Sequence, residues 1–350
     1  MKNIKGAEIP GAKVLQNIPV AGITKIRDIR YPENPQQVGI VGEIADFDSD
    51  IANCANMEFA DHGKMPSFNN YLDIDAALNI LREFDKRQEA ACVIVKHRNP
   101  CGFALDKDSL NAYANAFRAD SLSAFGGIIG FTRTVNYETA AEINKQFAEI
   151  VIAPFYTEAA MAELCKKKNL RIATMTKPLT SDKSRYEFRS VSGLVLAQEV
   201  NDVRFEDLKF EFPTIRKPTA KEMADLAVAF YIAKHGISNA VAFVMDKRLV
   251  AGGYGQQSRI DSVKAAFEKA RSIAEMQKSA TLERPLFGTV FASDSFFPDP
   301  DCVEFAGRAG ATAVVHPGGS IKDKDAIEAA NRYHMAMVLT GLNESRTFKH

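Results

Sequence analysis

The sequence has no excess of either charge and no long apolar segment. Its 350 residues contain 44 lysines and arginines against 44 aspartates and glutamates, so no net positive field attracts nucleic acid or an anionic membrane. No apolar run approaches the roughly 20 residues that a membrane helix needs, and the amino terminus has no apolar signal segment. We therefore expect a protein that binds neither nucleic acid nor membranes, so any basic site must be a local pocket.

Cysteine is scarce, and the spacings typical of metal sites are absent. The five cysteines are odd in number and widely scattered, which is typical of free thiols in a reducing compartment. A zinc-dependent deaminase needs His-x-Glu and Pro-Cys-x-x-Cys, but Pro100 and Cys101 are not followed by a second cysteine at that spacing. The sequence predicts a cytoplasmic protein with no zinc or other metal ligands.

Apolar strands alternate with helical segments in both halves of the chain, which predicts an α/β protein. The order of elements is similar in the two halves, although the sequence shows no convincing repeat. Residues 1–29 lack strong periodicity and are expected to form an amino-terminal arm. A charged, irregular stretch at 180–220 divides the rest, so we expect one subdomain over 30–200 and a second over 201–350.

The most informative segment is Val93–Gly102, where an apolar, β-branched run ends in a cation and an imidazole. Pro100 disfavours helical angles at Asn99, so the chain is expected to break and turn there. Lys96 and His97 then lie at the end of a buried strand, where α/β proteins bind ligands. The ammonium group disfavours a second positive charge nearby, so His97 can accept a proton. The dipeptide alone also fits a solvated strand end with no catalytic role.

A second segment, residues 237–260, combines Ser238 and Asn239 with a glycine loop and a helix start. Glycines let backbone amides approach an anion, and the first turn of a helix presents free N–H groups. Arg259 either binds a phosphate with its planar guanidinium or holds the loop that does. Glycine at a strand–helix turn also serves purely steric purposes, so the loop alone leaves both interpretations open.

The remaining candidate segments lie near the carboxyl end. Phe296 and Phe297 are either core residues or a platform for a flat ring. The spacing of Ser320 and Asp323 fits a helix capping box. Arg346 lies in a tail that would ordinarily be solvated. Each of these segments therefore has a structural interpretation beside the functional one.

Together these segments resemble the 5-aminoimidazole-4-carboxamide ribonucleotide (AICAR) formyltransferases, the transformylase part of the bifunctional purine-biosynthesis enzymes. The resemblance implies two cytidine-deaminase-like α/β/α subdomains in tandem and a homodimer whose active site lies partly across the interface. The matching motifs run in order from about residue 24 to the end: Arg30-Tyr31, Lys64–Asn70, Lys96-His97-x-Asn-Pro-x-Gly, Ser123-Ala-Phe-Gly-Gly, Ile152-Ala-Pro, Ser238-Asn239, Gly255-Gln-Gln-Ser-Arg, Ser293-Asp-x-Phe-Phe-Pro and Pro317-Gly-Gly-Ser.

By position, the resemblance implies that His97 is the proton acceptor and that Lys96 stabilises the transition state. The positions implied for the nucleotide are Arg30, Tyr31, Gly126, Glu149, Asn239, Arg259, Phe296 and Arg346. The positions implied for the folate are Ile260, Asp301, Ser320 and Ile321. Pro32 and Gln36 replace the Gly and His usual in the first motif, and so alter the loop that contains Arg30.

The implied reaction transfers a formyl group from 10-formyltetrahydrofolate to the 5-amino group of AICAR in purine biosynthesis. The amine is a poor nucleophile because it is conjugated with a carboxamide, so a base must take its proton as it attacks. A cation next to the reacting carbon stabilises the oxyanion that develops. 10-Formyltetrahydrofolate is the expected co-substrate, a monovalent cation such as potassium is left open, and no zinc is expected.

Only a short segment precedes Arg30, whereas the family carries a cyclohydrolase domain there. We therefore expect a monofunctional formyltransferase that depends on a separate inosine monophosphate (IMP) cyclohydrolase. One alternative is a nucleotide-binding sensor or inactive paralogue of the same fold. Another is an enzyme that uses formate and ATP, for which the phosphate-loop motif Gly-x-x-x-x-Gly-Lys-Ser/Thr is absent.

Overall fold

The computed structural model describes most of the chain. The described residues are the strands at 23–28 and 40–44, and residues 52–180, 186–192, 194–277, 284–341, 345–347 and 349. The predicted nucleotide residues Arg30 and Tyr31, together with Pro32 and Gln36, lie outside the described residues.

The first half of the chain contains a helix, a hairpin and then alternating helices and strands. Its elements are β3 (Met57–Phe59), α1 (Phe68–Arg82), β4 (Ala90–Lys96), β5 (Asn99–Asp106), α2 (Ser109–Ala119), α3 (Ser121–Ala124), β6 (Ile128–Phe131), α4 (Tyr137–Asn144), β7 (Ile150–Ala153), α5 (Glu158–Leu164) and β8 (Arg171–Met175).

The second half repeats this order from α1 onward, without a counterpart of the short α3. Its elements are α6 (Ala220–His235), β11 (Val241–Met245), β12 (Arg248–Gly253), α7 (Arg259–Met276), β13 (Val290–Ser293), α8 (Asp301–Arg308), β14 (Ala313–His316), α9 (Asp323–Arg332) and β15 (Ala336–Leu339). The repeated order confirms the predicted α/β fold built from two similar units in tandem.

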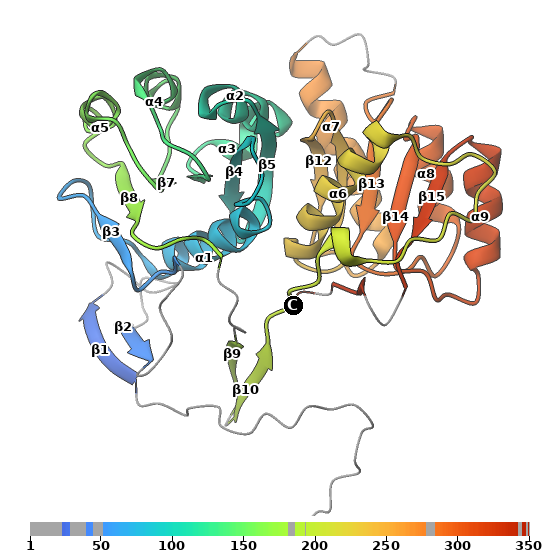
Figure 1. Ribbon diagram of the computed structural model, residues 1–350, viewed down its shortest axis with the longest axis horizontal. Helices are drawn as coiled ribbons and strands as arrows, with labels where there is room; N and C mark the ends of the chain where they lie inside the picture. Colours follow the sequence, from blue (N-terminus) through green and yellow to red (C-terminus); the bar gives the residue numbers. More distant parts are fainter. Residues whose placement is uncertain are drawn as a thin grey trace, which may run out of the picture.

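The two halves share one mixed sheet of eleven strands, in the order β15-β14-β13-β11-β12-β5-β4-β6-β7-β8-β3. They meet in the middle, where Arg248 of β12 pairs with Ala104 of β5. In Figure 1 the first half lies at the left in blue and green, and the second half at the right in yellow and red. The two hairpins are therefore neighbours at the centre of the sheet.

The helices form layers on the two faces of this sheet. α1 and α6 share one buried cluster, in which the ring of Phe84 lies 4.5 Å from Phe103 and 5.4 Å from Tyr231. Two further clusters lie under α2, α4 and α5 and under α7, α8 and α9. The core under α1 and α6 is common to both halves, so it fixes one half against the other.

The structure corrects the expected break at Asn99–Gly102. β5 begins at Asn99, and the turn lies one step earlier, at His97 and Arg98. Pro100 fits near the start of this strand because the pairing register with β4 shifts at Val95, opposite the proline. A proline has no N–H for the ladder and is tolerated at such irregular positions.

Two small antiparallel pairs lie outside the main sheet. β1 (Ile23–Asp28) pairs with β2 (Ile40–Ile44), and β9 (Tyr186–Val191) pairs with β10 (Leu194–Glu199), below the main body in Figure 1. A short 3-10 helix, η1 (Phe205–Asp207), follows β10. The predicted limits at 29 and 200 lie within the first pair and after the second, and the domain limits stay predictions. No helix in the described part of the chain is long and apolar enough to span a membrane.

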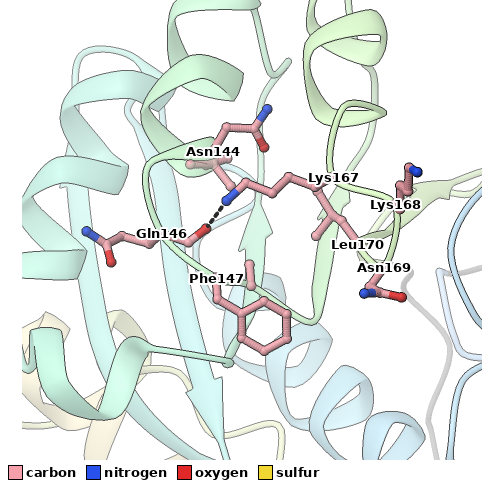
Figure 2. A pocket seen from close by; sticks show the side chains of 9 residues that line it. Asn144, Gln146, Phe147, Lys167, Lys168, Asn169 and Leu170 are labelled. Carbon is pink, nitrogen blue, oxygen red and sulfur yellow. Dashed lines mark hydrogen bonds between the residues drawn. The ribbon is translucent and has the colours of Figure 1, made fainter.

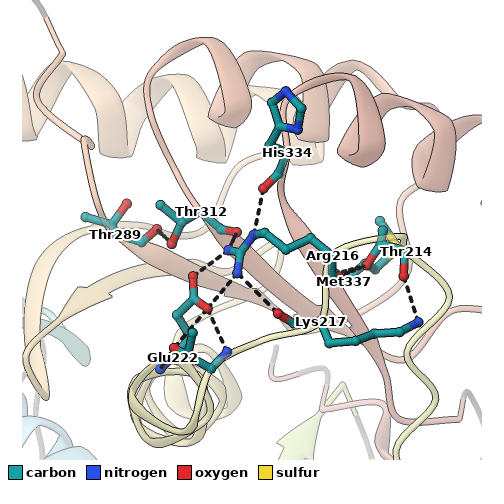
Figure 3. A network of polar contacts seen from close by, with 9 residues as sticks. Thr214, Arg216, Lys217, Glu222, Thr289, Thr312, His334 and Met337 are labelled. Carbon is teal, nitrogen blue, oxygen red and sulfur yellow. Dashed lines mark hydrogen bonds and ion pairs between the residues drawn. The ribbon is translucent and has the colours of Figure 1, made fainter.

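The segment 211–217 covers the outer edge strand β15. Glu211 exchanges two backbone hydrogen bonds of 2.9 Å with Leu339, one as donor and one as acceptor. Arg216 fastens the segment through an ion pair of 2.5 Å with Glu222 on α6 (Figure 3). This cover occupies backbone groups of an edge that would otherwise be open to pairing with another chain.

Candidate active site

The turn between β4 and β5 places Lys96 and His97 at one rim of the sheet. His97 and Arg98 have φ values of 52° and 65°, the pattern of a tight two-residue hairpin turn. Lys96 is half-buried, and its Nζ donates to the carbonyl of Phe125 at 2.8 Å. His97 is exposed. Because β4 ends at Lys96, neighbouring side chains of the dipeptide need not point to opposite faces of a regular strand.

Two side chains hold this turn from different sides. The carboxylate of Asp73 on α1 accepts the backbone N–H of Arg98 at 2.6 Å. The side-chain oxygen of Asn99 accepts the N–H of Ile237 from the second half at 3.0 Å. Burial raises the pKa of Asp73, although the hydrogen bond from Arg98 favours its charged form. Nothing in the local sequence marks Asp73, because its partner is distant along the chain.

The described site residues of both halves lie along the same rim. In the first half, β6 begins opposite the end of β4, where Ile128 pairs with Val95. In the second half, β11 begins opposite the end of β13, where Val241 pairs with Ser293. The bond between Asn99 and Ile237 joins these two stretches of rim into one region.

Arg259 is buried, and its guanidinium is bound by the protein itself. One terminal nitrogen donates to Ser293 at 2.9 Å and forms an ion pair with Asp294, and the other donates to the Asn239 side chain at 2.7 Å. The Asn239 amide in turn donates to the carbonyl of Gln256 in the glycine loop at 2.8 Å. Of the two roles that the sequence left open for Arg259, this geometry favours support of the loop.

The carboxyl-terminal tail packs against this network. The N–H of Thr347 donates to the carbonyl of Asp294 at 3.0 Å, and the N–H of Ser238 donates to the carbonyl of Lys349 at 2.8 Å. The Ser238 hydroxyl also donates to the Asp294 carboxylate at 2.5 Å. Arg346 is exposed on this docked tail, in the region of the Arg259 network.

Gly126 and Glu149 lie on neighbouring loops of the first half. Gly126 has a φ of 74°, and its N–H donates to the carbonyl of Phe147 at 2.8 Å. The carboxylate of Glu149 pairs at 2.6 Å with Arg171, whose side chain is only 2% exposed. Arg171 also donates to the carbonyl of Lys64 at 2.7 Å. Arg171 thus fixes Glu149 beside the Lys64 loop, a role that local sequence did not reveal.

The four predicted folate residues lie at the starts of helices or in loops after β12, β13 and β14. Ile260 is half-buried at the start of α7, and Asp301 is exposed at the start of α8. Ser320 is half-buried, and Ile321 is fully exposed. An ion pair between Lys322 and Asp299 holds the two loops near each other. Asp301, Ser320 and Ile321 therefore lie on neighbouring loops of the second half, and Ile260 lies after β12 on the same rim.

The structure also shows how the Phe296-Phe297 pair is packed and whether Ser320 and Asp323 form a capping box. Phe297 is fully buried, with its ring 4.7 Å from that of His316, whereas Phe296 is half-buried. The capping box is wrong, since α9 has Lys322 as its N-cap, with no side-chain cap bond. The Asp323 carboxylate instead accepts the N–H of Gly319 at 2.7 Å.

None of the described candidate residues lines either of two hollows in the described surface. The first, of about 110 Å³, lies among residues 143–148 and 167–170, where Lys167 donates to the carbonyl of Gln146 at 3.1 Å (Figure 2). The second, of about 250 Å³, lies between α3 and α7, beside the ion pair of Asp120 and Lys269. The candidate residues instead occupy the rim surface.

The cysteine thiols and the potential metal ligands are the remaining reactive groups of the described residues. All five cysteines are free, and burial raises the pKa of Cys101 on β5 to about 12, which keeps its thiol protonated. No group of three or more His, Cys, Asp and Glu residues within the described ranges is placed to hold a metal ion.

Comparison with known proteins gives the family. The family model described as "AICARFT/IMPCHase bienzyme" matches residues 5–269. The chain is 41% identical over 344 residues to the "Bifunctional purine biosynthesis protein PurH" of Caldicellulosiruptor saccharolyticus, covering 98% of this chain and 63% of that protein. For the protein of the same name from Aquifex aeolicus, the identity is 40% over 328 residues, covering 94% of this chain and 60% of that protein. The chain spans about three fifths of the length of these relatives. It belongs to the AICARFT/IMPCHase bienzyme family.

Proposed function

We propose that this chain transfers a formyl group from 10-formyltetrahydrofolate to the 5-amino group of AICAR. The observation that supports this most directly is the contact of Asn99 with Ile237. It brings the turn with Lys96 and His97 to the segment that begins the Asn239 and Arg259 network. A base, a cation and the Asn239 and Arg259 network thus lie next to one another on one rim of the sheet.

In this proposal His97 takes the proton of the amine as the nitrogen attacks the formyl carbon. Lys96, held at the strand end by the Phe125 carbonyl, stabilises the oxyanion of the tetrahedral intermediate. Gly126, Glu149, Asn239, Phe296 and Arg346 contact the nucleotide, as do Arg30 and Tyr31, with Arg259 supporting the loop. Ile260, Asp301, Ser320 and Ile321 line the folate site.

A second copy of the chain completes the site in this proposal. Two apolar side chains beside the Lys96 contact are exposed, Phe125 at 55% and Phe147 at 37%, and their rings lie 5.4 Å apart. Covering them in a homodimer would remove apolar surface from water. Sedimentation equilibrium tests this, and a monomer at micromolar concentration would contradict it.

A cytoplasmic location and a requirement for a monovalent cation such as potassium stay predictions. Replacing potassium with choline in the assay tests the cation requirement.

The test is a comparison of two adjacent turn variants. His97→Asn removes the imidazole but suits the left-handed backbone, which asparagine tolerates. We expect turnover with 10-formyltetrahydrofolate to fall by about two to four orders of magnitude, as on loss of a general base. Arg98→Asn is the matched control at the other left-handed position and should lose far less. Activity of His97→Asn above about a tenth of wild type would overturn the assignment.

Assays on the same purified protein distinguish this function from two alternatives. A sensor or inactive paralogue would bind AICAR in a calorimeter yet give no formylated product. An enzyme that uses formate and ATP would turn over with that pair and not with the folate. We expect product only with 10-formyltetrahydrofolate.

A further inference from the structure

A helix aspartate binds the backbone of the catalytic turn in the first half. Asp73, on the second turn of α1, accepts the N–H of Arg98 at 2.6 Å. The turn needs positive φ at both His97 and Arg98, which is uncommon for residues other than glycine and is least favourable here for Arg98. The carboxylate therefore stabilises a backbone conformation that the sequence itself disfavours.

The second half contains the same device at the matching position. Asp225 on α6 accepts the N–H groups of Asp246 and Lys247 at 3.1 and 2.7 Å. These two residues form the turn between β11 and β12, with φ values of 53° and 58°. Asp73 and Asp225 are thus structural counterparts, each holding the left-handed turn of the hairpin that follows its helix.

The two turns differ in what surrounds them. The carbonyl of Lys247 accepts the N–H of Leu105 at 3.1 Å, and its side chain pairs with Glu89. Leu105 lies near the end of β5 and Glu89 precedes β4, so this turn lies at the rim opposite His97. Only the turn held by Asp73 bears a residue of the candidate active site.

We propose that Asp73 is a positioning residue for formyl transfer, because it holds the turn that presents Lys96 and His97. This inference rests on the proposed function. Without the carboxylate, the Arg98 amide loses its partner and the turn can relax toward more favourable φ values. His97 would then move relative to the bound amine, and small misplacements of a catalytic group reduce turnover strongly.

Four variants test this, with kcat, KM and the urea midpoint measured for each. Asp73→Ala should lower kcat by about ten- to a hundredfold and change both KM values far less. Asp73→Asn keeps an acceptor oxygen at the same place, so it should retain most of the activity. Asp73→Glu keeps the charge but displaces the acceptor by one methylene, so it should lose more than Asp73→Asn. Asp225→Ala is the matched control, expected to reduce the urea midpoint but not kcat.

Amide hydrogen exchange of the peptide spanning residues 94–102 measures the stability of the turn independently of enzyme activity. Faster exchange is expected in Asp73→Ala and not in Asp225→Ala. If Asp73→Ala does not fold, the order of the Asn and Glu variants decides the matter, since a role through charge alone would reverse it. Wild-type kcat in Asp73→Ala, or an equal loss in Asp225→Ala, would overturn the inference. A wild-type chain that makes no formylated product would overturn the proposed function instead, while the exchange rates would still decide whether Asp73 holds the turn.

Discussion

The side-chain oxygen of Asn99 accepts the backbone N–H of Ile237 at 3.0 Å, across the boundary between the two halves of the sheet. Asn99 directly follows the turn that bears His97, and Ile237 directly precedes Ser238 and Asn239. This hydrogen bond therefore links the turn that bears the candidate base directly to the segment that contains Ser238 and Asn239.

Removing this bond should weaken catalysis without unfolding the chain. Loss of one neutral hydrogen bond costs about 1 kcal/mol, so Asn99→Ala should lower kcat/KM for AICAR by about fivefold. Asn99→Asp keeps an acceptor and should lose less. Asn111→Ala, at a half-buried position on α2, controls for a general effect of asparagine removal. A kcat/KM equal to wild type in Asn99→Ala would show that the contact does not position the turn.

Arg259→Ala should be strongly destabilising, because it leaves the buried carboxylate of Asp294 without its charged partner. Breaking a buried ion pair costs about 3–5 kcal/mol. Arg259→Lys keeps the charge but not the planar fork that reaches Ser293 and Asn239, so it should recover only part of the loss. Urea titration measures this, with Arg271→Ala on the exposed face of α7 as control. A midpoint shift no larger than that of the control would contradict the role as loop support.

Stability should fall in mild acid because of two buried histidines. Burial lowers the pKa of His316 to about 3, helped by nearby Arg259, and lowers that of His235 to about 4 despite its contact with Glu83. In the unfolded chain each histidine takes up a proton near pH 6.5. The free energy of unfolding is therefore unaffected by these histidines above pH 6.5, and it decreases as the pH falls from 6.5 toward 4, because the unfolded chain binds protons that the folded chain does not.

His316→Asn checks this origin of acid sensitivity. Asparagine can still accept the N–H of Gly318, which His316 accepts at 3.1 Å through Nδ1, but it cannot take up a proton. The free energy of unfolding of the variant should therefore depend less steeply on pH between 6.5 and 4, by up to about 1.4 kcal/mol per pH unit. Parallel curves for variant and wild type over that range would exclude His316 as a source.

Local patterns predicted most of the elements because their signals lie within single segments. The short apolar run Ile150–Ala153, followed by Pro154, has the pattern of a buried strand, and it forms β7. Asp246 and Lys247 interrupt a second apolar stretch, and they form the turn between β11 and β12. For the equivalent turn at His97 the sequence indicates a break at Pro100 instead. The strand tolerates Pro100 because the pairing register with β4 shifts there, which local sequence does not reveal.

The supporting residues of the site could not be predicted in the same way. Arg171 and Asp73 act on partners far away in sequence, and the burial of Arg259 follows from the ends of β11 and β13 meeting at one rim. Such contacts exist only once the sheet has formed, so residue type and spacing contain no local signal for them.

The last prediction concerns the product made by this 350-residue chain alone. Under the proposed function the motifs matched in the sequence serve formyl transfer, and the resemblance implies that ring closure needs a site of its own. Formyl transfer to a weakly nucleophilic amine is expected to be poorly favourable, so product should accumulate only while a second enzyme removes it. When the purified chain is given AICAR and 10-formyltetrahydrofolate, the formylated nucleotide should reach an early plateau and no IMP should form. Liquid chromatography measures both products over time. Adding an IMP cyclohydrolase should remove the formylated nucleotide, so that AICAR consumption continues and IMP forms. Stoichiometric IMP from the chain alone would contradict this expectation and require a second active site within it.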